Sequence, residues 1–345
     1  MRIGVVGAGA IGGYLASRLH LAGHDVTVVV RPEYVDALVH DGIRVRLGRD
    51  VAISAVRVVD RLMDTPDLLL LAVKTQDLAE ACEAVLPAAS GVTAVTLQNG
   101  VRADAIASSI LGAEAIVGGI AMCAVTCLQP GIVSVDVPGW FILGQLPHTT
   151  NGRVTTAART LGQVVATFVT VNLAGARWSK LIGNLTNGLS AATGLSLAEL
   201  ARHPVGRQLA IKLMREGHNV ARAAGIRLDR HVYGLDLTRA GTSVLPLLQA
   251  TVTNLLPSLP EPISASIFSL AGRTSLGRAN FRGSTWQSLV RGKTTEIDYL
   301  NGEIVRLGGR IGVGTPYNAR VLDAVHAAER SKHNLPLTEL WPSAT

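Results

Sequence analysis

A glycine-rich turn near the N-terminus constrains the fold of this chain more than any other stretch. Residues 2–6 form a short apolar run, residues 7–13 read Gly-Ala-Gly-Ala-Ile-Gly-Gly, and residues 14–19 continue with helical spacing. A strand, a G-x-G-x-x-G turn and a helix in this order are the fingerprint of a dinucleotide-binding unit. The start of the chain therefore predicts a βαβ fold.

The spacing of the glycines has a physical cause. Gly7 permits the tight turn, Gly9 lets the backbone approach a pyrophosphate, and Gly12 lets the helix lie close to the strand. The N–H groups and the positive dipole end of the helix then face the phosphates. We predict that the cofactor contacts are made by Gly7, Ala8, Gly9, Ala10, Ile11 and Gly12.

The end of the second predicted strand bears on which dinucleotide binds. Residues 25–30 are apolar and β-branched, which predicts a strand beside the first. An NAD site carries an acidic residue at the end of this strand, whereas this chain has Arg31. A guanidinium suits a 2′-phosphate, so the sequence favours NADP(H). Two alternatives stay open: Arg31 is a solvated side chain before a turn at Pro32, or Glu33 serves an NAD ribose.

Composition indicates a globular protein with a small-molecule ligand. The chain has 345 residues, of which 48% are hydrophobic and 17% charged, enough for two domains with cores. The net charge of +7 is spread without a Lys/Arg block, and aromatic residues are 4%, which favours anionic small molecules over nucleic acid.

The apolar and cysteine-containing segments predict a cytoplasmic protein without a membrane segment. The apolar segment 116–128 is shorter than the roughly 20 residues that span a bilayer. Three cysteines, an odd number, predict reduced thiols: Cys82, Cys123 and Cys127. No nearby histidine or further cysteine completes a zinc site, so no metal is predicted.

The remaining pattern predicts an α/β fold: an N-terminal Rossmann-type domain over residues 1–174, followed by an all-α domain over 175–345. Strands are expected at 43–47, 51–56, 68–73, 92–97, 118–128, 131–137, 140–143 and 167–171, and helices at 33–40, 76–86 and 155–165. From residue 176 onward the pattern is helical.

Two strand ends carry polar residues where a cofactor would lie. The buried run 68–73 ends in Lys74, and the run 92–97 ends in Gln98-Asn99-Gly100. Ligands of open α/β sheets bind at the carboxyl ends of the strands, which makes Lys74 and Asn99 cofactor candidates. Asn-Gly is also a common turn dipeptide, so a purely structural role remains open.

Lys180 is the first catalytic candidate. The chain has only five lysines against twenty-seven arginines, and a lysine in an apolar helix provides a group that can give up a proton, as arginine cannot. Asn184 and Asn187 follow at helical spacing and share a face with Lys180. Such a polar face is costly to bury without partners, which a substrate and a carboxylate would supply. The alternative is a solvent-facing stripe on a surface helix.

The second candidate is the segment 293–302, which contains Glu296. Thr295 with Asp298 is able to cap a helix start, and acidic residues favour the dipole of a first turn. That explanation alone is sufficient, so the residues leave a functional role for Glu296 open.

Taken in order, these motifs resemble the ketopantoate reductase family. The resemblance rests on the 7–12 turn with Arg31, Val73-Lys74, 98–100, Trp178-Ser179-Lys180-Leu181 with Asn184, Ser284, 295–302 and Gly314-Thr315-Pro316-Tyr317-Asn318. It implies NADPH-dependent reduction of 2-dehydropantoate to (R)-pantoate on a Rossmann domain followed by an all-α domain.

The resemblance also assigns roles to single residues. Lys180 takes the place of the catalytic lysine, which as an ammonium would protonate the substrate oxygen, and Glu296 that of the substrate-binding glutamate. Asn184 and Ser284 match substrate residues, Arg31 the cofactor-phosphate arginine, and Lys74 and Asn99 the cofactor-facing pair. The resemblance assigns no donor to the substrate carboxylate; from their position beside Ser284 in the sequence, we expect Arg282 and Asn280 to be the donors.

Two departures from the family pattern concern the substrate. Many members carry a second substrate asparagine eight residues after the lysine, whereas this chain has Asn187 at seven and Gly188 at eight. We expect both offsets to lie on roughly the same helix side. The region 229–282 is longer than in compact members, and the apolar stretch 245–270 within it is a candidate homodimer interface.

Two other functions are compatible with the residues. A reductase or dehydrogenase of the same fold would act on another branched 2-oxo acid. A non-catalytic NADP-binding sensor would need the glycine turn and Arg31 but has no use for Lys180 or Asn184.

Overall fold

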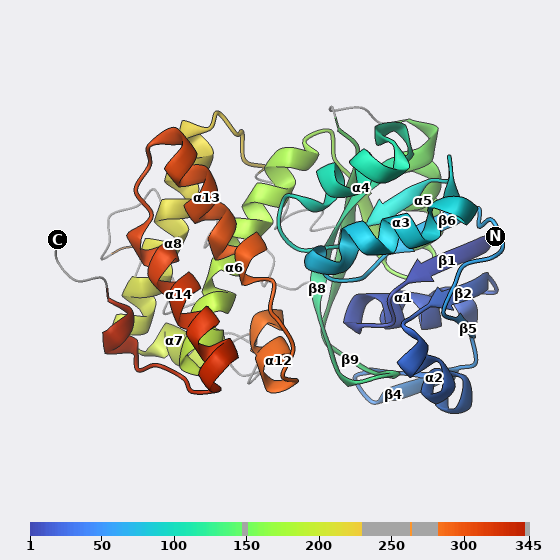
Figure 1. Cartoon of the computed structure of the whole chain (residues 1–345), viewed down its shortest axis with the longest axis horizontal. Helices are drawn as coiled ribbons and strands as arrows, with labels where there is room; N and C mark the ends of the chain where they lie inside the picture. The colour runs from blue at the N-terminus through green and yellow to red at the C-terminus, as the bar shows by residue number, and fades with distance from the viewer. Residues whose placement is uncertain (147–150, 230–262, 264–281, 342–345) are drawn as a thin grey trace. The chain divides into compact units, whose positions relative to one another are not determined.

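The computed structural model describes residues 1–146, 151–229, 263 and 282–341. The chain divides into two compact units, Met1–Leu173 and Ala174–Thr345 (Figure 1). The longer region at 229–282 and the candidate interface at 245–270 lie almost wholly outside the described residues.

The first unit is built on one mixed sheet of ten strands. Its order is β4-β3-β9-β8-β7-β6-β1-β2-β5, with β10 beside β9. The strands are β1 (Arg2–Val6), β2 (Asp25–Val29), β3 (Ile43–Leu47), β4 (Asp50–Ser54), β5 (Arg57–Val59), β6 (Leu68–Leu71), β7 (Ala94–Thr96), β8 (Ile116–Gln129), β9 (Ile132–Gly144) and β10 (Ala166–Val169). From β5 through β2, β1, β6 and β7 to β8 all pairs are parallel. In chain order this is the 3-2-1-4-5-6 arrangement of dinucleotide-binding folds.

Helices cover both faces of this sheet because its central strands are apolar on both sides. Ile3 and Leu70 pack into one core with α1 (Ala10–Leu21) and α5 (Gly152–Gly162). Val6 and Leu71 pack into the other core with α3 (Leu78–Ala89) and α4 (Ala103–Leu111). The unit also contains α2 (Val35–Asp41) and the 3-10 turns η1 (Pro32–Tyr34), η2 (Thr75–Asp77) and η3 (Ala113–Ala115).

The long hairpin of β8 and β9 corrects one expectation. The dipeptide Pro138-Gly139 predicted a break between two strands, but β9 runs through it without interruption. Met122 pairs with Trp140 and Ala124 with Val137, so β9 holds one extra residue here and forms a bulge. A bulge accommodates a proline that cannot donate to the ladder, and Gly139 leaves room for the backbone of β8 at Met122.

The described part of the second unit is helical. It contains α6 (Leu173–Thr193, which starts on the last residue of the first unit), α7 (Leu197–Arg202), α8 (Pro204–Ala223), α12 (Ser284–Val290), η6 (Ile297–Tyr299), α13 (Asn301–Ile311), α14 (Pro316–Ser331) and η7 (Leu337–Leu340). Among the described helices, none is long and apolar enough to cross a membrane.

A buried polar network ties α6 to three other helices. The Glu216 carboxylate on α8 accepts bonds from the backbone N–H groups of Tyr317 and Asn318 at the start of α14, both at 2.9 Å. The Asn318 amide also donates to Glu216, at 2.7 Å. Asn301 on α13 donates to Asn318 Oδ1 at 2.9 Å and to the Leu185 carbonyl of α6 at 3.2 Å. Because buried polar groups need their partners, this network fixes the position of α6.

Candidate functional site

The glycine turn after β1 has the geometry that the sequence predicts. Gly7 has φ +97°, a conformation that side chains disfavour. A Cβ on Gly12 would overlap the Gly7 carbonyl oxygen, so glycine is required for α1 to leave the turn at this angle. A Cβ on Gly9 would meet nothing within 4 Å.

The turn fits a dinucleotide phosphate. Residues 7–11 are half-buried, and Gly9 forms the N-cap of α1 without a capping side chain. Open space at Gly9 and an uncapped helix N-terminus are the features that a pyrophosphate binds. Within the described residues, no group of three or more histidine, cysteine, aspartate or glutamate side chains is placed to hold a metal ion.

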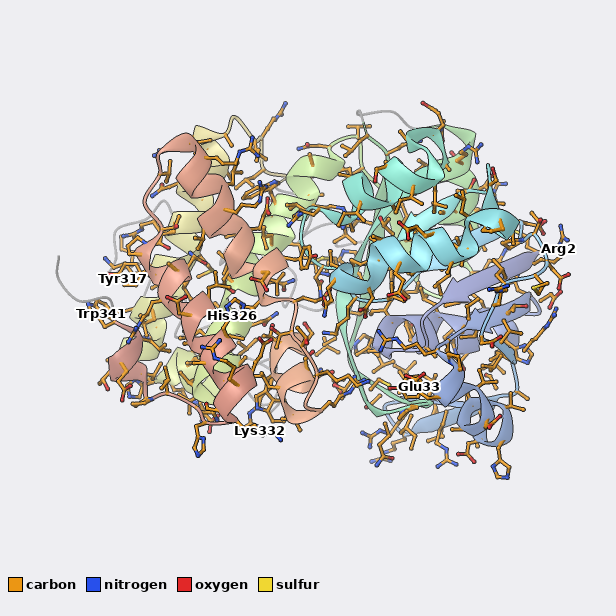
Figure 2. The ribbon with its side chains drawn as sticks, in the orientation of Figure 1. Arg2, Glu33, Tyr317, His326, Lys332 and Trp341 are labelled. Atoms are coloured by element: carbon orange, nitrogen blue, oxygen red, sulfur yellow. The ribbon has the colours of Figure 1, made fainter. Side chains whose placement is uncertain are left out.

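Arg31 lies beside this turn and is paired with an aspartate. It follows β2, and the Gly7 N–H donates to the Val29 carbonyl of that strand at 2.8 Å. Arg31 Nη2 lies 3.3 Å from Asp77 Oδ1, and the two side chains are 56% and 39% exposed. Glu33 is exposed at the start of the same segment (Figure 2). The guanidinium is therefore accessible to a ligand.

Lys74 and Asn99 lie on neighbouring loops because β6 and β7 are paired in parallel. Both residues are half-buried, and the Thr75 hydroxyl donates to the Asn99 carbonyl at 3.4 Å. Gln98 holds the two strand ends together: its amide donates to the Leu71 carbonyl at 2.9 Å and to the Val73 carbonyl at 3.0 Å.

Sequence reasoning did not select Gln98 as a supporting residue. The signal that could have identified Gln98 is a polar side chain directly after an apolar strand. In the structure this side chain is buried, with 4% of its surface exposed. Its amide bonds place the Lys74 and Asn99 loops at the same sheet edge as the glycine turn, where parallel strands end.

In the second unit, α6 has one polar face that is half-buried. Leu181, Ile182 and Leu185 are fully buried. Lys180, Asn184 and Asn187 are half-buried, and Asn187 Nδ2 lies 3.4 Å from Asn184 Oδ1. The helix is not a surface helix with a solvated stripe, since its other sides are core. Lys180, Asn184 and Asn187 thus form one half-buried polar face of an otherwise buried helix.

The two offsets after Lys180 do not face the same way, which corrects an expectation. A Cβ on Gly188 would lie 2.5 Å from Asn301 Oδ1 and 2.8 Å from Ile297 Cδ1, so this position faces the helical core. Asn187 contacts α12 instead, since a Cβ on Gly283 would overlap its amide. Ser284, the first residue of α12 and half-buried, is thereby brought beside Asn187.

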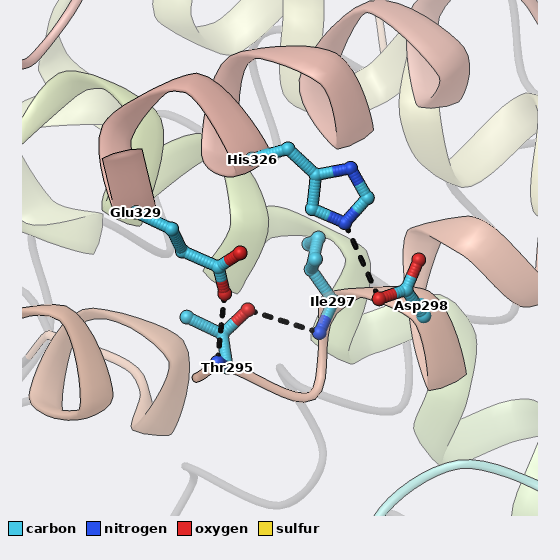
Figure 3. A network of polar contacts seen from close by, with 5 residues as sticks. All are labelled: Thr295, Ile297, Asp298, His326 and Glu329. Atoms are coloured by element: carbon cyan, nitrogen blue, oxygen red, sulfur yellow. Dashed lines mark hydrogen bonds and ion pairs between the residues drawn. The ribbon is translucent and has the colours of Figure 1, made fainter. Parts of the chain in front are cut away.

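Glu296 is buried at the start of η6, with 7% of its surface exposed. The capping explanation holds for Thr295 only, and it accounts neither for Asp298 nor for Glu296. Thr295 Oγ1 accepts the Ile297 N–H at 3.2 Å, whereas Asp298 is half-exposed and bonds to His326 of α14 at 3.2 Å (Figure 3).

The segment before Glu296 is anchored to α14. The Thr295 N–H donates to Glu329 at 2.8 Å (Figure 3). On the other side, Ile297 packs against Gly188 of α6. These two contacts place Glu296 beside the helix that carries Lys180.

The geometry argues against Arg282 as the donor to a substrate carboxylate. Its Nε donates to the Gly194 carbonyl at 3.0 Å, and its guanidinium stacks 4.9 Å above the Trp286 ring. Gly194 lies fourteen residues after Lys180, which is about 20 Å along a helix. Asn280, the other expected donor, lies outside the described residues.

Family models and relatives agree on one family. The model described as ketopantoate reductase PanE/ApbA matches residues 3–148, and its C-terminal model matches residues 172–329. A 2-dehydropantoate 2-reductase of Mesorhizobium japonicum is 28% identical over 322 residues, covering 81% of this chain and 99% of its own. The 2-dehydropantoate 2-reductase of Pyrococcus horikoshii is 24% identical over 331 residues, covering 95% and 98%.

Solved structures share the fold over nearly the whole chain. A PanE/ApbA family ketopantoate reductase from Ralstonia eutropha matches with a TM-score of 0.77 and 27% identity, covering 96% of this chain and 100% of its own. A D-mandelate dehydrogenase with NADH and anilino(oxo)acetate matches with a TM-score of 0.79 and 23% identity, covering 96% and 99%. The second likeness shows the fold alone.

Proposed function

The chain belongs to the ketopantoate reductase family, and from this premise we propose that it reduces 2-dehydropantoate to (R)-pantoate with NADPH. Members of this family are oxidoreductases that use a dinucleotide on a small-molecule keto acid. The NADP(H) preference, the substrate and the roles of single residues are parts of the proposal.

The cofactor is held by residues of the first domain, 1–174. The glycine turn from Gly7 to Gly12 takes the pyrophosphate, Arg31 takes the 2′-phosphate, and Lys74 and Asn99 line the adjoining strand ends. When bound, NADPH supplies the hydride that the reduction requires. The open space at Gly9 and the exposed guanidinium of Arg31 support this assignment.

The substrate is handled by residues of the second domain, 175–345. As hydride reaches the carbonyl carbon of the 2-oxo acid, negative charge develops on the oxygen. The ammonium of Lys180 stabilises this charge and donates a proton to the oxygen, a role worth about 10²- to 10⁴-fold in rate. Glu296 binds the substrate hydroxyl and keeps Lys180 charged.

The amides of Asn184 and Asn187 and the hydroxyl of Ser284 orient the same substrate. The observation that carries the proposal is the polar face of α6. The other sides of this helix are fully buried, and its one half-buried polar side carries an amine and two amides. A protein that only stores a nucleotide has no need for that combination.

Absorbance loss of NADPH on mixing with 2-dehydropantoate tests the proposal. Rapid loss supports it, loss only with other branched 2-oxo acids assigns a different substrate, and no loss with any of them points to a sensor. Lys180→Ala should fold and bind NADPH but lose at least about 100-fold in kcat.

Lys212→Ala is the matched control for this substitution. Lys212 is a half-buried lysine on α8 whose ammonium lies 5.9 Å from the Tyr317 ring centroid. It should keep the wild-type kcat. Full activity of Lys180→Ala would remove this amine from the mechanism.

A further inference from the structure

Arg31 and Asp77 reach each other from opposite sides of the glycine turn. Arg31 follows β2, and Asp77 ends η2, which follows β6. The sheet order β2-β1-β6 puts β1 and its turn between them. Neighbouring strands are about 4.8 Å apart, so the 3.3 Å ion pair joins two segments across the end of β1.

This pair has little value for the stability of the fold. Both side chains are substantially exposed, and exposed ion pairs contribute little because water and salt screen them. A 2′-phosphate carries up to two negative charges and forms charge-assisted hydrogen bonds with a guanidinium. It therefore competes with Asp77 for the same partner.

We propose that Asp77 is a specificity-determining residue of the cofactor site, which occupies the Arg31 guanidinium in the free protein and opposes the 2′-phosphate of NADP(H). This inference rests on the proposed function, in which Arg31 binds that phosphate. NADH has no phosphate at this position, so Asp77 lowers the affinity for NADPH and leaves the affinity for NADH unchanged. The preference of the protein for NADPH over NADH is therefore smaller than it would be without this carboxylate.

The other charges near the pair do not replace this effect. Glu33 adds one exposed negative charge two residues after Arg31, and Lys74 adds a positive charge three residues before Asp77. Asp77 differs from both because its carboxylate is paired directly with the Arg31 guanidinium. A phosphate bound to Arg31 would lie about 5 Å from it, well within the Debye length of about 8 Å at physiological salt.

Replacing the carboxylate with a neutral isostere gives the expected magnitude. For a dianion about 5 Å from a single charge in a water-like medium, Asp77→Asn should tighten NADPH roughly 3- to 10-fold at low salt. A 5-fold gain corresponds to about 1 kcal/mol. Affinity for NADH should stay within about 2-fold, and 0.5 M salt should reduce the NADPH gain.

Asp67→Asn is the matched control. Asp67 pairs with Arg2 at 3.0 Å and is 40% exposed, nearly the same as Asp77. Asp67 directly precedes β6, and Arg2 is the first residue of β1. This control pair therefore lies at the start of the strands, whereas Arg31 and Asp77 lie beyond the strand ends. Its removal should leave the affinities for both cofactors unchanged.

The experiment is a fluorescence titration of wild type, Asp77→Asn and Asp67→Asn with NADPH, NADH and adenosine 2′,5′-bisphosphate. The bisphosphate carries the 2′-phosphate without a nicotinamide and should gain affinity in Asp77→Asn as NADPH does. In an Arg31→Ala background, Asp77→Asn should gain less than in the wild type, because the part of the effect that comes from occupying Arg31 is lost and only the direct repulsion of the phosphate remains.

Unchanged or weaker NADPH binding by Asp77→Asn would overturn the inference and leave the proposed function standing. Weaker NADH binding by the same variant would overturn it too, because Asp77 would then accept the ribose hydroxyl. No NADPH binding by the wild type would overturn the inference and the proposed function together.

Discussion

Gly188→Ala perturbs the contact between α6 and the rest of the second unit. The added Cβ would lie 2.5 Å from Asn301 Oδ1, 2.8 Å from Ile297 Cδ1 and 2.9 Å from Val321 Cγ1. All three separations are below those that real Cβ atoms show, so at least one neighbour has to move. A shift of Asn301 would be the most damaging of the three, because its amide donates hydrogen bonds to the Leu185 carbonyl and to Asn318.

The cost follows from these contacts. Overpacking a filled core costs about 1 to 3 kcal/mol, and weakening a buried hydrogen bond of Asn301 costs about 1 kcal/mol more. Alanine recovers about 1 kcal/mol through its higher helix propensity. The net loss is about 1 to 3 kcal/mol, which lowers Tm by roughly 2 to 4 °C per kcal/mol in a unit of this size.

Thermal unfolding followed by circular dichroism measures this loss, and Gly309→Ala is the control. Gly309 lies inside α13, is exposed, and has nothing within 4 Å of an added Cβ. It should raise Tm, since only the propensity gain of about 1 kcal/mol applies. If Gly188→Ala also raised Tm, the packing of α6 against Asn301 and Ile297 would be refuted.

Two further predictions concern the cofactor turn and the buried carboxylate. Gly9→Ala should leave Tm nearly unchanged, because the added Cβ meets nothing within 4 Å. The same Cβ would enter the space proposed for the pyrophosphate, so NADPH binding should weaken roughly tenfold or more, about 1.4 kcal/mol. Gly12→Ala should instead destabilise the fold by about 1 to 3 kcal/mol or more through backbone overlap; equal Tm for both variants would contradict these roles. Burial raises the pKa of Glu216 above its ordinary 4.5, while N–H groups of Tyr317 and Asn318 oppose the shift. Its contribution to stability is thus present below about pH 4.5 and lost as pH rises through the raised pKa. Between pH 5 and 8, Tm of the wild type should fall more than Tm of Glu216→Gln, and parallel profiles would contradict the shift.

Local chemistry made much of the fold and part of the site predictable. The positive φ of Gly7 and the close contact at Gly12 follow from glycine spacing between a strand and a helix. The face shared by Lys180, Asn184 and Asn187 follows from helical periodicity alone. Each of these inferences uses only residues that are close together in the sequence.

Contacts between distant segments could not be predicted in the same way. The sequence Pro138-Gly139 signals a turn, and only the register of β8 shows that it forms a bulge. Asp298 is a reasonable capping residue by spacing, and its bond to His326 depends on the position of α14. The bond between Glu216 and Asn318 joins residues 102 positions apart, and no local pattern encodes such a pairing.

The departure at Gly188 has a structural explanation that bears on substrate binding. An asparagine at this position would enter the core at Asn301, so the second amide stands one residue earlier, at Asn187. That placement requires a neighbour without a side chain, and Gly283 supplies it at the N-cap of α12. Two glycines thus set the side of α6 from which the second amide is presented. Because Gly283 directly precedes Ser284, the packing that admits Asn187 also places the start of α12, and with it Ser284, next to Asn187.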